Sequence, residues 1–165
     1  MMHNRFSVQS RGDAVREVDW AQSAALLVRR EAAAAIGWFD TNFFVYSDEV
    51  DFCKRLRDNG WSVLYVPQAE VVHHEQLASG TVPERRIVEL SRNRDRYMRK
   101  HHSPAAARVV RWLTAWTYAV RAAGAVVVPG HSPRRYWRHV TATLRPGRGE
   151  GLREAALEHN RGRRL

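Results

Sequence analysis

The sequence has a single cysteine, no long apolar run and no apolar segment near its start. With Cys53 alone, an internal disulfide is excluded. A transmembrane helix needs roughly 18 or more mainly apolar residues, and no uncharged run of that length occurs, so none is expected. Residues 1–10 are polar, so we expect no signal peptide there. Cys53 lies on a predicted helix, and we expect it to be a core residue rather than a nucleophile.

Acidic residues are few in the second part of the chain. Residues 1–75 contain 8 Lys and Arg against 11 Asp and Glu, a net charge of −3. Residues 76–165 contain 19 against 6, a net charge of +13. A strongly basic region attracts anionic partners. We therefore expect this part to face phospholipid, nucleic acid or a lipid-phosphate substrate.

The acidic part contains three carboxylates that directly follow a run of aromatic residues. Asp48, Glu49 and Asp51 open a predicted helix over 48–59, which Gly60 ends. The helix dipole favours acids at this position, so the three could simply stabilise the helix start. Side chains of this kind could also act in acid/base chemistry.

Short apolar runs predict strands at 24–28, 61–66 and 71–72. His73 and His74 follow the last of these runs directly. Carboxylates on a helix start together with a histidine on a neighbouring strand end make a plausible metal or acid/base site. The alternative is an exposed histidine pair with no ligand. We likewise expect His101 and His102 to be a solvated helix end rather than a ligand pair.

Helix signals cover most of the remaining sequence. Proline and serine or threonine at helix starts, with glycine and proline after helix ends, predict helices over 31–36, 81–100, 104–128, 133–144 and 151–160.

The helix predicted over 104–128 is amphipathic. It is expected to gather its large apolar residues on one face, namely Val109, Trp112, Leu113, Trp116, Val120 and Val127. Its other face is expected to carry Arg108, Arg111, Tyr118 and Arg121. Such a helix either lies at an anionic membrane surface or packs on the rest of the protein with its arginines in water.

Taken together, residues 18–74 resemble the acceptor-side, C-terminal half of family 2 glycosyltransferases, the inverting GT-A enzymes of the rhamnosyltransferase and galactofuranosyltransferase type. The matching residues are Gly37, Phe39, Asp40, Phe43, Phe44, Tyr46, Asp51, Cys53, Arg55, Leu56, Arg57, Gly60, Trp61, Tyr65, Pro67, His73 and His74. The resemblance implies an α/β fold: a partial GT-A fold over 18–80 with few strands plus helices, followed by an all-helical basic extension over 81–165. Residues 1–17 are expected to be a loop or disordered.

The resemblance also implies roles for individual residues. Glu49 stands where the family has its catalytic base, with Asp48 before it, so the family's Glu-Asp order is reversed here. Glu49 would remove the acceptor hydroxyl proton during attack on the sugar. His73 or His74 would bind a divalent metal, Mg or Mn, that neutralises the donor diphosphate. Substrate binding falls to Trp38, Asp40, Tyr46 and Asp51, although the aromatic residues could be core and Asp40 could make a turn.

No nucleotide-binding half with a D-x-D motif precedes residue 18, so we expect a fragment that does not bind nucleotide sugar tightly alone. The expected partners are a nucleotide sugar, a glycan or lipid-linked acceptor, an anionic membrane surface and a separate nucleotide-binding chain. The expected location is the cytoplasm, at the inner face of the plasma membrane, and the expected process is cell-envelope polysaccharide synthesis. The alternatives are a non-catalytic interaction partner and a basic nucleic-acid-binding protein, although no specific nucleic-acid motif occurs.

Overall fold

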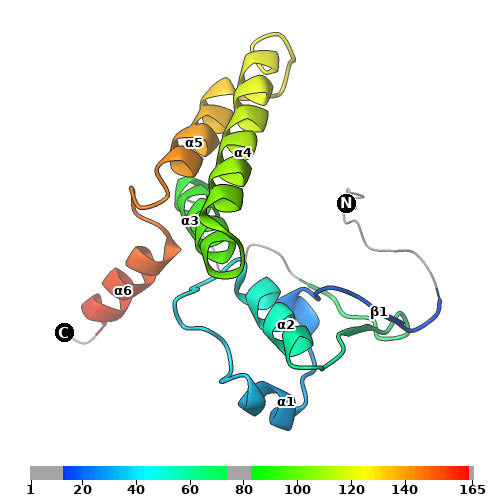
Figure 1. Cartoon of the computed structure of the whole chain (residues 1–165). Coiled ribbons are helices and arrows are strands. Elements are labelled where there is room, and N and C mark those ends of the chain that lie inside the picture. The colour runs from blue at the N-terminus through cyan, green and yellow to red at the C-terminus, as the bar shows by residue number, and fades with distance from the viewer. Residues whose placement is uncertain (1–12, 74–82, 164–165) are drawn as a thin grey trace.

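The structure, a computed structural model, describes residues 13–73 and 83–163 (Figure 1). In chain order its elements are β1 (Arg16–Glu17), the 3-10 helix η1 (Ser23–Ala25), α1 (Arg30–Ala35), α2 (Asp48–Asp58), β2 (Leu64–Tyr65), α3 (Pro83–His101), α4 (Pro104–Gly124), α5 (Pro133–Leu144) and α6 (Leu152–Gly162). The described residues are mostly helical with one small sheet. At this coarse level the predicted combination of helices and strands is confirmed.

The sheet has two antiparallel strands. Arg16 lies opposite Tyr65 and Glu17 opposite Leu64. The prediction that residues 1–17 form only a loop is therefore wrong for 16–17, and the predicted strand over 61–66 shrinks to two residues.

The strands predicted at 24–28 and 71–72 are wrong. Residues 23–25 form the 3-10 helix, and Leu27 is completely exposed. Val71 and Val72 are exposed too, at 66% and 82%. A buried strand needs backbone partners on its edges, and in the described part of the chain the only sheet is the pair β1–β2.

The core of the first part lies between α1 and α2. Ala32 and Ala33 of α1 pack against Phe52 and Leu56 of α2. The prediction that Phe52 and Leu56 face inward is thus confirmed. Beside them Cys53 is fully buried, and burial raises the pKa of its thiol, as expected of a core cysteine rather than a nucleophile.

Helices α3, α4 and α5 pack on one another, and α6 packs on α3 (Figure 1). The starts of α4 and α5 follow the sequence signals, because Ser103 and Ser132 accept hydrogen bonds from backbone N–H groups in the first turn and proline follows each. The helix predicted to reach residue 128 ends at Gly124 instead. No helix among the described residues is long and apolar enough to span a membrane.

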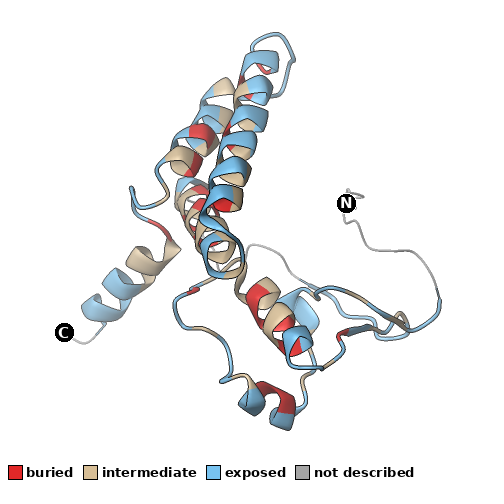
Figure 2. Cartoon of the chain, in the orientation of Figure 1, coloured by how far each residue is buried: buried red, intermediate tan, exposed pale blue. Residues whose placement is uncertain are grey.

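Helix α4 packs through its small side chains. Ala107, Ala115 and Ala122 are buried, and the Tyr118 ring stacks on His139 of α5 with 4.2 Å between centroids. The large apolar residues lie on the exposed side of α4, between 53% and 69% exposed (Figure 2), namely Val109, Trp112, Leu113, Trp116 and Val120. The alternative in which this apolar face packs on the protein is therefore wrong.

Helix α6 begins against a buried carboxylate of α3. Glu89 is 1% exposed, and one of its carboxylate oxygens accepts a hydrogen bond from the Arg153 N–H at 3.2 Å. A negative charge at a helix N-terminus is stabilising. The close approach needs a glycine, because a Cβ on Gly151 would lie 2.3 Å from a Glu89 oxygen.

Candidate functional site

The candidate site begins at an unusual turn before α2. Tyr46 and Ser47 have φ angles of 68° and 63°, in the left-handed region that residues other than glycine rarely adopt. Each such residue costs on the order of 1 kcal/mol, so it persists only where the surrounding contacts hold it in place. This turn sets the direction in which α2 starts, and therefore where Asp48 and Glu49 lie.

Helix α3 supplies the contacts that hold the turn. The Arg86 Nε donates to the Tyr46 hydroxyl at 2.8 Å. The Asn93 side-chain amide donates to the Val45 carbonyl at 2.7 Å and to Glu89 at 2.9 Å, and Asn93 is fully buried. A buried amide with these partners fixes the backbone more firmly than an exposed contact does.

These contacts belong to a polar stripe on α3, formed by residues spaced three and four apart: Arg86, Glu89, Asn93, Arg96 and Lys100. The Arg96 guanidinium donates to the Asn42 carbonyl, and the Lys100 ammonium to the Asp40 carboxylate at 2.7 Å. Residues at this spacing share one helix face. The polar stripe therefore binds the segment 40–46 along most of the length of α3. Our reading of the sequence missed it, although its spacing was visible there.

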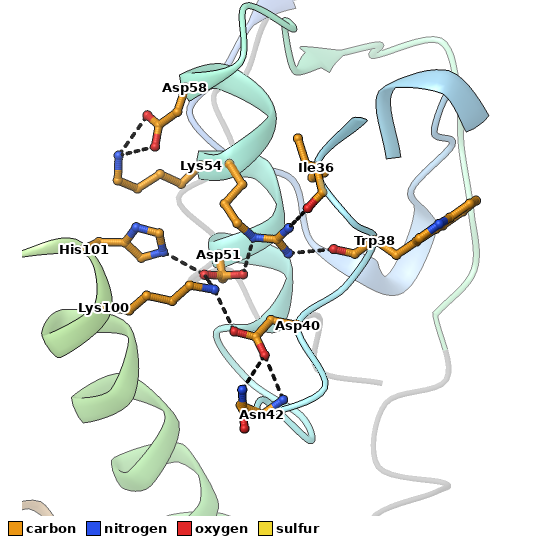
Figure 3. A network of polar contacts seen from close by, with 10 residues as sticks. Ile36, Trp38, Asp40, Asn42, Asp51, Lys54, Asp58, Lys100 and His101 are labelled. Carbon is orange, nitrogen blue, oxygen red and sulfur yellow. Dashed lines mark hydrogen bonds and ion pairs between the residues drawn. The ribbon is translucent and has the colours of Figure 1, made fainter. Parts of the chain in front are cut away.

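Asp51 is the centre of a second set of contacts (Figure 3). Its side chain is fully buried, and its carboxylate contacts Arg55 Nε, Lys100 Nζ and His101 Nε2, each at 2.7 Å. Arg55 also donates to the carbonyl of Ile36 at 2.7 Å and to that of Trp38 at 2.8 Å. One carboxylate thus joins α2, the end of α3 and, through Arg55, the segment that follows α1.

These contacts correct the prediction for His101 and show protein partners for Asp51 and Asp40, which were predicted to bind substrate. His101 is not a solvated helix end, because its side chain is only 9% exposed and contacts Asp51. Burial alone would raise the pKa of Asp51, but Lys100, His101 and Arg55 lower it below its usual value. Lys100 and the Asn42 amides hold the pKa of Asp40 at about 2. Both carboxylates have protein partners. The sequence left open whether Asp40 binds substrate or makes a turn, and here it accepts hydrogen bonds from the Asn42 backbone and side chain, as in a turn.

Glu49 has the electrostatics of a proton acceptor. It is partly buried in the first turn of α2. Burial, followed by the neighbouring Asp48 carboxyl group, raises the pKa of Glu49 to about 7. A carboxylate is a better base when its pKa lies near the working pH. Asp48 and Glu49 therefore form a pair in which Asp48 raises the pKa of Glu49. Two acids that only stabilised a helix start would not need such a shift.

Exposed aromatic rings lie on the segment that leads to this pair. Trp38, Phe39 and Phe44 are 51%, 41% and 44% exposed. Phe43 is buried, and Tyr46 uses its hydroxyl to bind Arg86. Of the aromatic residues predicted to bind substrate, Trp38 therefore presents the largest open ring.

The predicted metal site lies partly outside the described residues. His74 is not described, and His73 is exposed. Among residues 13–73 and 83–163, no three or more His, Cys, Asp or Glu side chains lie close enough together to hold a metal ion. The metal stays a prediction.

The comparisons with known proteins concern 106 residues, or 64% of the chain. Over these the sequence is 34% identical to N-acetylglucosaminyl-diphospho-decaprenol L-rhamnosyltransferase of two Mycobacterium tuberculosis strains, and it covers 34% of that protein. Over these residues the chain is therefore similar to a rhamnosyltransferase. A second relative, rhamnosyltransferase WbbL of Escherichia coli K12, is 33% identical over 57 residues, 34% of this chain and 22% of that protein. The predicted resemblance to rhamnosyltransferases of the family 2 type is confirmed.

The chain spans about a third of the length of the Mycobacterium relatives. No protein-family model matches it, and no solved structure does. The GT-A assignment and the predicted division at residues 18–80 and 81–165 therefore stay predictions.

The first prediction concerns the buried carboxylate. Asp51→Asn removes the charge that compensates Arg55 and Lys100, and we expect it to lower the free energy of unfolding by about 3 kcal/mol. The matched control is Asp58→Asn, which removes an exposed contact to Lys54 on the same helix and should cost about 0.5 kcal/mol or less. Urea unfolding measures both changes.

The pH dependence of this loss is a further check. Because the folded-state pKa of Asp51 is lowered, its stabilisation is present above about pH 4 and is lost as the pH falls through the folded-state value. Equal unfolding midpoints for the two variants would contradict the proposed role of Asp51.

The second prediction concerns Glu49. In a carbon-detected NMR titration we expect its carboxyl resonance to titrate near pH 7. Asp48→Asn removes the neighbouring acid and should lower this pKa in part, because burial, the larger cause of the raised pKa, remains. Because the folded-state pKa is raised, Glu49 makes the fold less stable as the pH rises from about 4.5 through 7. A wild-type titration near 4.5 would show that Glu49 is an ordinary helix-start acid.

Proposed function

We propose that this chain is the acceptor-side, catalytic segment of an inverting glycosyltransferase that transfers rhamnose from a nucleotide sugar to a lipid-linked glycan acceptor. The observation that carries the proposal is Glu49, whose pKa of about 7 suits a base and which lies in the stretch that resembles the family. The names of the relatives support the sugar and, for the Mycobacterium proteins, an acceptor of the diphospho-decaprenol type.

In the proposed reaction the Glu49 carboxylate takes the proton of an acceptor hydroxyl. The hydroxyl oxygen then forms a bond to the anomeric carbon of the sugar, while the bond from that carbon to the nucleoside diphosphate breaks. The diphosphate leaves with the bonding electrons, and a single displacement of this kind inverts the anomeric centre. The Glu49 side chain is one methylene longer than the aspartate of the family pattern. Its partly buried surroundings must therefore position the carboxylate at the acceptor hydroxyl.

The acceptor sugar is proposed to lie against Trp38. Indole rings offer a flat apolar surface for the C–H face of a sugar, and the Trp38 backbone is fixed because its carbonyl accepts from Arg55. Three other predicted substrate-binding residues are proposed to hold the site in shape rather than to touch substrate. Asp40 binds Lys100, Asp51 binds Arg55 and His101, and the Tyr46 hydroxyl accepts from Arg86.

The remaining partners predicted from the sequence stay proposals. The described residues hold no complete ligand set for Mg or Mn, so no step of the reaction is assigned to a metal. A separate chain with the nucleotide-binding half would supply the donor site. The reaction is proposed to take place at a membrane surface, because a lipid-linked acceptor stays in the bilayer; the cytoplasmic side is the one that the sequence resemblance implies.

The third prediction tests the base. Glu49→Gln should lower the rate of rhamnose transfer to an N-acetylglucosaminyl-diphospho-polyprenol by about a hundredfold or more. The matched control is Glu31→Gln, an acid in the first turn of α1, which should leave the rate unchanged. Product is measured by mass spectrometry.

The assay has two arms, one with this chain alone and one with the chain mixed with the nucleotide-binding part of the Mycobacterium relative. If neither arm forms product, or if the Glu49 variant is as fast as the wild type, the proposed function is wrong.

The fourth prediction concerns the acceptor and needs no donor. Trp38→Ala should weaken binding of the same acceptor to the chain about fivefold, because a sugar–indole contact contributes about 1 kcal/mol. Trp20 is exposed to nearly the same extent, 48% against 51%, so Trp20→Ala is the control and should not change the affinity. Calorimetry with a short-chain acceptor gives both constants. Equal losses in the two variants would remove Trp38 from the acceptor site.

A further inference from the structure

Helices α4 and α5 form a hairpin that extends away from α1 and α2 (Figure 1). Its far end is the connection between the helices, and this connection is apolar. Val126, Val127 and Val128 are 73%, 79% and 48% exposed there, just before Pro129 and Gly130. Three consecutive valines at the tip of a helix hairpin thus expose apolar surface to water.

The outward face of α4 continues this apolar surface. Trp112 and Trp116 are 65% and 69% exposed on it, together with Val109, Leu113 and Val120. We call these five residues and the three tip valines the hairpin surface. Large indole rings at the boundary between apolar and polar surroundings are typical of proteins that lie in a membrane interface.

The charge around the hairpin surface has one sign. Residues 103–149 contain eight arginines and neither aspartate nor glutamate. Two of these arginines are engaged by acids of α3, Arg111 by Asp95 and Arg138 by Glu84. Four others on these two helices are exposed. Arg121 lies in the last turn of α4 and Arg134 and Arg135 in the first turn of α5, beside the tip, while Arg108 lies near the start of α4.

We propose that the hairpin surface docks on an anionic membrane, with the tip valines and the two tryptophans in the interface and the exposed arginines at lipid phosphates. Charge complementarity selects this occupant, because arginine without neighbouring acids attracts anionic headgroups and valine side chains gain free energy only in an apolar phase. A second copy of the hairpin would bring like charges together. Nucleic acid would satisfy the arginines but not the valines.

This inference goes beyond sugar transfer and does not depend on it. The sequence left open whether α4 lies at a membrane surface or packs on the protein. The inference chooses the membrane, and it names the tip as the part that inserts and the tryptophan side of α4 as the side that faces the lipid. Its test contains neither donor nor acceptor, so it can fail while the proposed glycosyl transfer holds, and the reverse.

The experiment is sedimentation of the full chain with vesicles of phosphatidylglycerol and phosphatidylcholine in equal parts, against pure phosphatidylcholine vesicles. We expect binding to the anionic vesicles only. Replacing the tip (Val126→Ser, Val127→Ser and Val128→Ser) or the indoles (Trp112→Ala and Trp116→Ala) should each weaken it about tenfold or more. Arg134→Gln with Arg135→Gln should weaken it about tenfold.

The matched control is Val71→Ser with Val72→Ser, two consecutive exposed valines in the other part of the chain, which should bind as the wild type does. Circular dichroism checks that every variant is folded, which is expected because the changed side chains are already exposed. Lipids brominated on their acyl chains should quench the tryptophan fluorescence of the wild type and quench that of the Trp112/Trp116 variant less.

Three results would overturn the inference. Equal binding by the tip variant and the control would show that the hairpin surface is not the docking site. A wild-type dimer in sedimentation velocity that the Trp112/Trp116 variant lacks would make a second copy the occupant. Binding to random-sequence duplex DNA without binding to anionic vesicles would make nucleic acid the partner.

Discussion

The buried carboxylate of Asp51 is the contact on which the arrangement of the molecule depends. A charge without solvent is costly unless partners compensate it. Here Arg55 compensates it from the same helix, and Lys100 and His101 from the end of α3. Because Arg55 also holds two carbonyls of the segment after α1, three pieces of chain that are distant in sequence must come together at one point.

Helix α3 holds the segment before α2 through hydrogen bonds and ion pairs, together with contacts of Arg96 and Lys100 to the Phe43 ring. Apolar packing tolerates small sliding, whereas hydrogen bonds specify position and direction. The polar stripe of α3 holds segment 40–46 through bonds to Asp40, Asn42, Val45 and Tyr46. The left-handed residues Tyr46 and Ser47 stand where this segment meets α2. The orientation of α2, and with it the setting that raises the pKa of Glu49, is thereby determined by a helix nearly forty residues further along the chain.

The hydrophobic pattern of α4 shows the limit of periodicity as a guide. Its large apolar face was visible in the sequence, but the pattern alone does not say whether that face meets the protein. The face with Trp112 and Trp116 is left outside. The side that packs contains buried alanines that the sequence pattern did not single out, namely Ala107, Ala115 and Ala122. The same limit applies to Leu27, which is apolar and lies in an apolar run, yet is completely exposed because no strand pairs with its segment in the described structure.

By itself the sequence determined the starts of α4 and α5, the inward side of α2 and the acid pair at its start, together with the resemblance to rhamnosyltransferases. These features rest on capping residues, on spacing within one or two turns and on matched motifs, all of which are local. Only the tertiary structure decided that His101 and Lys100 meet Asp51 across about fifty residues, and which face of α4 is covered. Such contacts depend on how separate helices are placed, and no short-range pattern of residues encodes that placement.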